Sequence, residues 1–406
     1  MGTRVRTYAA LAAVVALFLI LSIALAACGG GDTTTTAAPA SGTTAGEATT
    51  TSAAPAGPIK IGFSGPLTGN GAAVGQDYLN GVMLYLDKIN AEGGVNGQTI
   101  EVVKEDDLMD PKNSTVVAQK LVDAGVIAVL GPLTSGSTIP TLNIYGDANI
   151  AQLTPASNPD VTAQGFTHVF RVDPDDLAQG GNIGRYCYDK LGAKTAAVIN
   201  DKQAFGQGVS EEFQKAFEAA GGTVTSVNGI TPGDVDFRAV LTKIKSENPD
   251  MVYFGGVAQE GGLIVKQLRD LGMEQIFFAP DQCFGPEFIK IGGDATEGAY
   301  ISYQGPPLDS TPELKTFLEE FSAAYGAEPF VGQFGYTSAQ LVVEALKTTG
   351  AADGAAIIEA LHSGEFQTIL GPYTFEENGA MGGGGTIYVY QVKDGKDGYL
   401  EASVPE

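Results

Sequence analysis

Short apolar segments alternate with helix-length amphipathic stretches along the chain from Pro58 onward. Residues 59–63 alternate apolar side chains as a strand does, and residues 79–86 carry them at helical spacing until Gly93 and Gly94 end the helix. The next apolar runs, each bounded by polar residues, glycine or proline, are residues 100–103, 127–130 and 150–153. Such runs predict strands that are buried on both faces in parallel sheets covered by helices.

The same alternation begins again near residue 196, which indicates a second lobe of the same kind. Its predicted strands are residues 196–199, 224–227, 251–254 and 276–279. Two further helices are expected around residues 314–321 and 341–346, and antiparallel strands near residues 386–392. About 350 residues after the N-terminal region are too many for one ordinary core. We therefore expect an α/β fold of two Rossmann-like lobes, each with a parallel sheet.

The first 27 residues have the pattern of an export signal. Arg4 and Arg6 precede an apolar run, residues 8–27, that is interrupted by Ser22. The run ends in LAACG, which resembles a bacterial lipobox, in which a lipid is attached to the cysteine and the preceding residues are removed. We expect residues 1–27 to be a lipoprotein signal peptide and Cys28 to be lipidated, with an extracytoplasmic protein anchored to the outer face of the cell membrane. An uncleaved membrane helix is the alternative.

The segment that follows Cys28 has the composition of a flexible linker. Residues 29–57 are almost entirely Gly, Thr, Ala, Ser and Pro, which cannot bury enough apolar surface to fold. We assign residues 28–57 to the lipidated cysteine and a tether, with a reach of roughly 30 Å. The formal net charge of −24 argues against a nucleic-acid partner and otherwise indicates a well-solvated surface.

The common signatures of catalysis and of metal or cofactor binding are missing. His168 and His362 lie far apart in the sequence without further ligands at coordination spacing, so we expect ordinary structural or surface roles for them. Neither a nucleophile elbow nor a P-loop occurs, and Val74 occupies the third glycine position of the segment GNGAAV, which makes it a weak dinucleotide fingerprint. No cofactor is expected. A disulfide between Cys187 and Cys283 stays open, because spacing alone does not fix geometry.

Three polar loops follow predicted strands, where open parallel sheets bind ligands. The loop GPLTSGST, residues 131–138, could donate hydrogen bonds to a carboxylate, although a plain helix N-cap explains it equally well. The loop TPASNP, residues 154–159, offers a second polar surface or a simple turn. Asp281 could face a ligand ammonium, or could be a solvated or capping carboxylate.

Five stretches in both predicted lobes are similar to one family, the branched-chain amino acid (Leu/Ile/Val-type) binding proteins of ABC transporters, which have the type I periplasmic binding protein fold. The stretches are DDLMDP (106–111), GPLTSGSTIP (131–140), DKQAFGQG (201–208), GITPGDVDF (229–237) and YFGG (253–256). The resemblance extends from Ile59 to about residue 392, nearly the whole body of the chain.

The resemblance implies a site for a zwitterion. Ser135, next to Thr134, and the loop of Ala156 and Ser157 would hold the ligand carboxylate, and Asp281 would hold its ammonium. This loop is one residue shorter than in many relatives, so either Ser157 or Asn158 makes the contact. Further positions match the family's pocket wall: Phe205 in the second lobe, and Val74 and Val257 where some members carry tyrosine. Met109 and Thr134 stand where some members have a disulfide, which is therefore absent here.

The resemblance also implies a hinge and a membrane partner. Three crossovers near Asp173, Tyr303 and Gly385 would let lobe 1 (residues 58–175 and 304–384) close on lobe 2 (residues 176–303 and 385–406) around the ligand. The expected protein is a monomer that delivers its ligand to ABC transporter permease subunits and makes or breaks no bond, so it is not an enzyme.

Three alternatives remain. Relatives bind amides, urea or aromatic acids, and Asp281 is the main reason to prefer an amine-bearing ligand here. A sensory receptor would need a membrane span or signalling domain after the binding fold, which we do not expect. An α/β enzyme would need a catalytic motif, and none was found.

Overall fold

The computed structural model describes residues 57–403, and its strands form two large sheets and one small hairpin. The predictions for the signal peptide, for Cys28 and for the linker up to residue 56 lie outside the described residues. The first sheet has the order β2-β1-β3-β4-β5, and all its strand pairs are parallel. Its strands are β1 (Ile59–Gly65), β2 (Ile100–Asp106), β3 (Ala128–Leu130), β4 (Ala151–Thr154) and β5 (Val169–Arg171).

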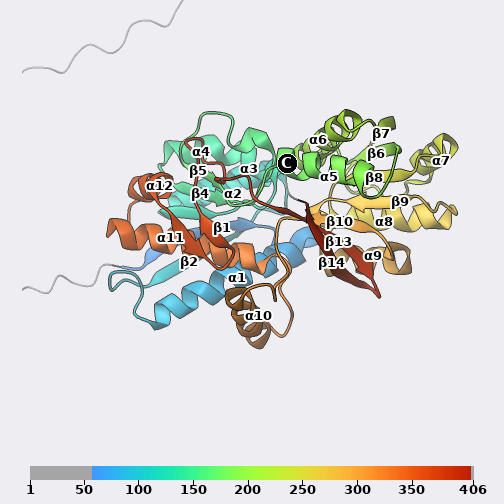
Figure 1. Ribbon diagram of the computed structural model, residues 1–406. Coiled ribbons are helices and arrows are strands. Elements are labelled where there is room, and N and C mark those ends of the chain that lie inside the picture. The colour runs from blue at the N-terminus through green and yellow to red at the C-terminus, as the bar shows by residue number, and fades with distance from the viewer. Residues whose placement is uncertain (1–56, 404–406) are drawn as a thin grey trace, which may run out of the picture. The chain divides into compact units, whose positions relative to one another are not determined.

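Helices from two separate parts of the chain cover the first sheet. The sheet and these helices together form what we call lobe 1. Figure 1 shows the N-terminal helices together with α11 and α12 around this sheet. The helices are α1 (Ala72–Ala91), α2 (Pro111–Asp123), α3 (Ser135–Thr138), α4 (Leu142–Asp147), α10 (Pro312–Tyr325), α11 (Gly332–Thr349) and α12 (Gly354–Ser363). Helices α1 and α11 lie very close, since a Cβ atom added at Gly81 would lie 1.8 Å from the carbonyl oxygen of Gly332. Glycine at position 81 is therefore required for this packing.

The second sheet has the order β14-β13-β10-β9-β8-β6-β7, and with its helices it forms lobe 2. Strands β6 to β10 pair in parallel, whereas β13 and β14 are antiparallel, as the sequence predicts. The strands are β6 (Thr195–Asn200), β7 (Thr223–Gly229), β8 (Met251–Gly255), β9 (Ile276–Ala279), β10 (Tyr300–Tyr303), β13 (Ile387–Lys393) and β14 (Lys396–Ser403). The helices are α5 (Asp176–Asp189), α6 (Ala204–Ala219), α7 (Arg238–Glu247), α8 (Ala258–Asp270) and α9 (Pro286–Gly292).

The chain passes three times between the two lobes. The first crossover joins β5 to α5, the second joins β10 to α10, and the third joins the hairpin of β11 (Phe366–Thr368) and β12 (Gly371–Tyr373) to β13. The two-lobed α/β fold predicted from the sequence is confirmed. Sequence periodicity did not identify β5 and β10, because Arg171 and Ser302 leave these strands without a continuous apolar run.

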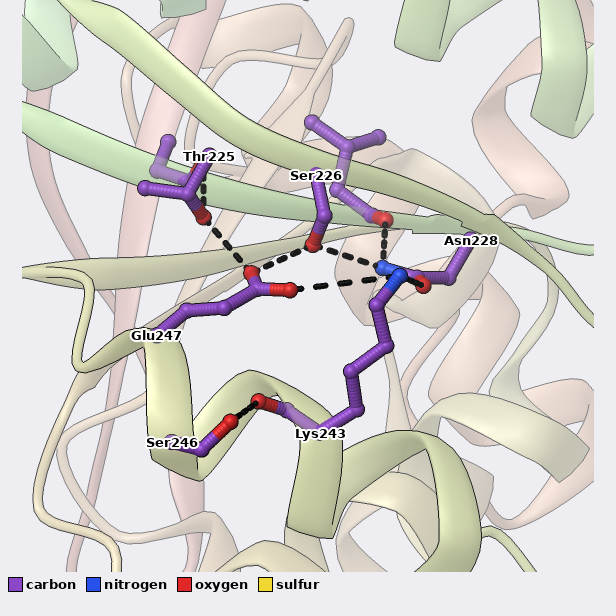
Figure 2. A network of polar contacts seen from close by, with 8 residues as sticks. Thr225, Ser226, Asn228, Lys243, Ser246 and Glu247 are labelled. Carbon is purple, nitrogen blue, oxygen red and sulfur yellow. Dashed lines mark hydrogen bonds and ion pairs between the residues drawn. The ribbon is translucent and has the colours of Figure 1, made fainter.

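A polar network secures the edge of the second sheet, where β7 has only one neighbouring strand (Figure 2). The register between β6 and β7 shifts at Thr225, so the side chains of Thr225 and Ser226 both reach α7. They donate hydrogen bonds of 2.9 and 2.6 Å to Glu247, and Lys243 donates one of 2.9 Å to Asn228. The network holds α7 against β7, the strand at the edge of the second sheet.

The cysteines and histidines of the described region have structural surroundings. Cys187 and Cys283 are both buried and form no disulfide with each other. His168 is 4% exposed, and burial lowers its pKa to about 4. The ring of His362 makes a 2.7 Å hydrogen bond with the carbonyl of Thr167. Within residues 57–403, no cluster of His, Cys, Asp or Glu could hold a metal ion, and none of the helices has the length and apolar character needed to cross a membrane.

Candidate functional site

A cavity lies where residues of both lobes and of the crossovers meet. About 30 Å³ of it is open to the centre of a water molecule, more than the roughly 10–15 Å³ that one ordered water needs. The polar residues of its wall are Asp173, Asp281, Gln282 and Gln304. The apolar and aromatic ones are Val74, Tyr78, Leu133, Pro155, Phe284, Tyr303, Phe330, Val331 and Phe334. Among the described residues that line it there is no lysine, arginine or histidine, so its only formal charges are carboxylates.

The polar groups of the cavity lie where strands end. Asp281 is the second residue after β9, Asp173 is the second after β5, and Gln304 directly follows β10. Pro155 follows β4 in the same way. Because the carboxyl ends of parallel strands share one edge of a sheet, each sheet directs its loops to a common region. The rule that identified Asp281 in the sequence therefore also applies to Asp173 and Gln304.

Asp281 is held in an environment that disfavours its charge. Burial raises the pKa of this carboxyl group to about 6, although the amide side chains of Gln179 and Gln304 lower it in part. Neither amide makes a hydrogen bond of ordinary length and angle to Oδ1, which is buried without a partner among the described residues. A buried carboxylate oxygen without a donor is costly, so this group is suited to receive one from a ligand.

The loop after β3 places Thr134 and Ser135 at the start of α3. Thr134 has the N-cap position but makes no side-chain capping bond, so plain capping does not account for it. The hydroxyl of Ser135, which is 1% exposed, accepts a 3.1 Å hydrogen bond from the backbone N–H of Asn158. The two polar loops of lobe 1 are thus joined directly.

The loop after β4 is shaped by hydrogen bonds of its own. The hydroxyl of Thr154 accepts a 3.0 Å bond from the N–H of Ala156 and donates one of 2.7 Å to the carbonyl of Pro132. Ser157 is 3% exposed and lies beside Asp176, the first residue of α5, whose N–H donates to the Ser157 carbonyl. Burial raises the pKa of Asp176, and the Ser157 hydroxyl opposes that rise.

Asn158 connects the two lobes. Its side-chain N–H₂ donates a 2.7 Å hydrogen bond to the carbonyl of Ala204 at the start of α6, while its Oδ1 accepts from the N–H of Asp160. Phe205 follows Ala204 and is 6% exposed. The contact therefore brings the α6 N-terminus and the lobe 1 loops together.

The structure gathers the sequence-predicted residues into two groups. Val74 and Asp281 line the cavity, and Thr134, Ser135, Ala156, Ser157 and Asn158 form the linked loops beside Leu133 and Pro155. Phe205 and Val257 are not among the described residues on the cavity wall; Phe205 is buried on α6, and Val257 lies half-buried before α8.

Sequence reasoning missed the aromatic part of the wall. Phe284 stacks on Tyr303 with ring centroids 3.9 Å apart and an interplanar angle of 15°. The Tyr303 hydroxyl donates to the carbonyl of Phe330 and accepts a 2.6 Å hydrogen bond from Gln333. These residues come from a lobe 2 loop, from β10 and from the segment around the α11 N-terminus, so only the fold brings them together.

Comparison with known proteins agrees with this architecture. A protein-family model described as "Periplasmic binding protein" matches residues 58–397. The leucine-, isoleucine-, valine-, threonine- and alanine-binding protein of Pseudomonas aeruginosa is 35% identical over 327 residues, which cover 80% of this chain and 87% of the relative.

Two solved structures have the same fold. A leucine-binding protein from Thermotoga maritima matches with a TM-score of 0.80 and 30% identity, over 86% of this chain and 99% of that one. The branched-chain amino acid transporter substrate-binding protein of Streptococcus pneumoniae, in complex with isoleucine, matches with a TM-score of 0.79 and 28% identity, over 86% and 99%. The chain therefore belongs to the periplasmic binding protein family, whose members bind solutes and are not enzymes.

Proposed function

We propose that this protein captures a small L-amino acid between its two lobes and delivers it to the permease of an ABC transporter. Membership of the family implies an extracytoplasmic location. The amino-acid ligand is supported by the names of relatives that bind leucine, isoleucine and valine. The single structural observation that carries the proposal is the cavity that combines the carboxylate of Asp281, whose Oδ1 has no partner among the described residues, with an apolar and aromatic wall.

Each end of a zwitterion has a suitable partner in the proposed site. The ammonium would donate to Asp281, and the charge-assisted hydrogen bond would compensate for the burial of that carboxylate. The ligand carboxylate would be received by the loops of Ser135 and Ala156–Ser157, where small hydroxyl side chains and the start of α3 supply donors. The aliphatic side chain would lie against residues such as Val74 and Phe334.

Binding would act through closure of the lobes about the three crossovers. The proposed ligand contacts come from both lobes, so the ligand binds the closed arrangement more tightly and raises its population. The hydrogen bond from Asn158 to Ala204 joins the two lobes and would stabilise this closed arrangement. The sequence of residues 1–57 supports a lipid anchor at Cys28 and a flexible tether that keep the protein near its permease.

A thermal-shift screen of the purified protein tests the proposal. The panel contains aliphatic L-amino acids, their 2-hydroxy acid analogues, amides and aromatic acids. A true ligand at 100 times its dissociation constant should add about 2.7 kcal/mol of stability. We expect L-amino acids to raise the unfolding temperature and their amine-free analogues to have little effect. Shifts with amine-free acids or amides alone would overturn the amino-acid assignment.

A further inference from the structure

Asp173 lies on the wall of the same cavity as Asp281 but reaches it from another part of the fold. It belongs to the first crossover, two residues after β5, and is 4% exposed. Its Oδ1 atom is buried without a hydrogen-bond partner among the described residues. A second carboxylate in one small cavity therefore has an unsatisfied oxygen, which requires an explanation.

The phenol donors that act on Asp173 are engaged elsewhere, whereas Gln304 Nε2 on the same cavity wall is a buried donor without a partner among the described residues. Tyr78 and Tyr303 line the same cavity as Asp173, and the pKa of Tyr78, Tyr303 and Tyr373 is raised mainly by burial and in part by the negative charge of Asp173. The Tyr78 hydroxyl pairs with Ser338 at 2.7 Å, the Tyr373 hydroxyl donates to the Val172 carbonyl at 3.0 Å, and the Tyr303 hydroxyl donates to the Phe330 carbonyl.

Arg171 is the cation whose charge acts on Asp173; its two terminal guanidinium nitrogens donate to other groups, and its Nε has no hydrogen-bond partner among the described residues. Its guanidinium donates to Thr162 at 3.2 Å and to Asp175 at 3.3 Å. Burial and the charge of Asp281 both disfavour the ionised form of Asp173 and raise its pKa. A cationic group placed in the cavity would relieve both effects, since the wall provides none of its own.

We propose that Asp173 is a second carboxylate of the ammonium site, so that the ligand's ammonium group lies between Asp173 and Asp281. This inference rests on the proposed function and narrows its substrate class. A primary ammonium has three N–H donors and can serve both carboxylates at once, as Lys does in proteins. A quaternary ammonium has no N–H donor, and a hydroxy acid has neither the charge nor enough donors. The site is thus selective for solutes with a free primary amine.

Isothermal titration of three variants tests this assignment. Asp173→Asn and Asp281→Asn remove one cavity carboxylate each and keep the side-chain shape, and Asp160→Asn removes an exposed charge off the cavity wall as the control. The probes are L-leucine, L-alanine and their 2-hydroxy acid analogues. We expect Asp173→Asn and Asp281→Asn each to weaken amino-acid binding about tenfold or more. Both should also reduce the preference for the amine over the hydroxy analogue, and Asp160→Asn should change neither quantity.

The outcomes separate this inference from the proposed function. If Asp281→Asn loses affinity and Asp173→Asn stays within about twofold of the wild type, the role of Asp173 is wrong and the proposed function stands. If the wild type prefers the hydroxy acids, the amino-acid function fails as well. Thermal unfolding without ligand supplies the second readout. Asp173→Asn should match or exceed the wild-type unfolding temperature, because a buried carboxyl group with an unpartnered oxygen is replaced by a neutral amide of the same shape, and a clear decrease would show a structural role instead.

Discussion

Two aspartates, one in each lobe, have the same raised pKa and different hydrogen-bond surroundings. Asp77 of lobe 1 and Asp281 of lobe 2 both have a pKa raised to about 6 by burial. Asp77 accepts hydrogen bonds of 3.0, 2.7 and 2.7 Å from the backbone N–H groups of Phe330, Val331 and Gly332 at the start of α11. Asp281 keeps an oxygen without a partner. A raised pKa alone therefore does not identify a ligand-binding acid. The hydrogen bonds that the two carboxylates accept distinguish Asp77 from Asp281.

This difference gives Asp77 a structural role and leaves Asp281 available to a ligand. Asp77 fixes the N-terminus of α11 and thereby the backbone of Phe330 and Val331, which line the cavity. The carboxylate of Asp77 in lobe 1 thus has its hydrogen-bond donors before the ligand arrives. The crossover and lobe 2 side retains unsatisfied carboxylates, and a ligand can complete them.

The largest expected effect comes from removing the satisfied aspartate. Asp77→Ala leaves three backbone N–H groups at the start of α11 without an acceptor, so we expect the free energy of unfolding to fall by about 3 kcal/mol. Asp281→Ala removes a carboxylate with an unsatisfied oxygen and should change the ligand-free stability by less than about 1 kcal/mol in either direction. Urea denaturation of both variants measures the difference. Equal losses of stability would remove the distinction between the two residues.

The pH dependence of binding tests whether the ionised form of Asp281 in lobe 2 binds the ligand. An ammonium group needs the ionised form of Asp281, whose pKa is about 6 in the ligand-free protein. Protonation below that pH opposes binding, so the contribution of Asp281 should make amino-acid affinity fall by up to roughly tenfold for each pH unit below 6. Titrations from pH 5 to 8 check this. Asp281→Asn should reduce this slope, and the remainder should come from Asp173, whose pKa is also raised by burial; Asp77, which titrates in the same range, is intact in both proteins and serves as the internal control.

A smaller effect is expected where the lobes touch. Asn158→Asp keeps the oxygen that accepts from the N–H of Asp160 but replaces the amide that donates to the Ala204 carbonyl. The new carboxylate loses this hydrogen bond and also repels the Ala204 carbonyl, so ligand binding should weaken about fivefold or more and the free energy of unfolding should change by less than about 1 kcal/mol. Calorimetric titration and urea denaturation report the two quantities. An unchanged affinity would mean that this contact does not contribute to closure.

The sequence predicts the strands and helices that position Asp77 and Asp281 better than it predicts the hydrogen bonds of their side chains. Buried strands such as residues 276–279 were predicted with their observed bounds, because a run of apolar residues between polar ends marks a strand on its own. Asp281 followed from the rule that loops after parallel strands bind ligands. Asp173 was considered only as a crossover residue, since Arg171 leaves β5 without a continuous apolar run. The same rule would have found it once that strand was known.

Other parts of the site depend on contacts between distant segments. The capping of α11 by Asp77 joins residues more than 250 positions apart, and the stacking of Phe284 on Tyr303 depends on how β10 meets the loop after β9. No local pattern encodes either contact. The sequence therefore identifies loops that can carry a site, and the fold decides which of their side chains remain unsatisfied.

The smallest effect is expected at the outer edge of lobe 2, where the polar groups are satisfied as they are around Asp77. Glu247 accepts hydrogen bonds from Thr225 and Ser226, and its side chain is 20% exposed (Figure 2). Because water can partly replace these bonds, Glu247→Ala should lower the free energy of unfolding by only about 1 kcal/mol and leave ligand affinity unchanged. Urea denaturation and titration calorimetry test both parts. A fall in affinity would show that the edge of the second sheet is coupled to the cavity. A carboxylate with all its hydrogen bonds, such as Glu247, would then also influence ligand binding, and unsatisfied oxygens alone would not identify the residues that matter for affinity.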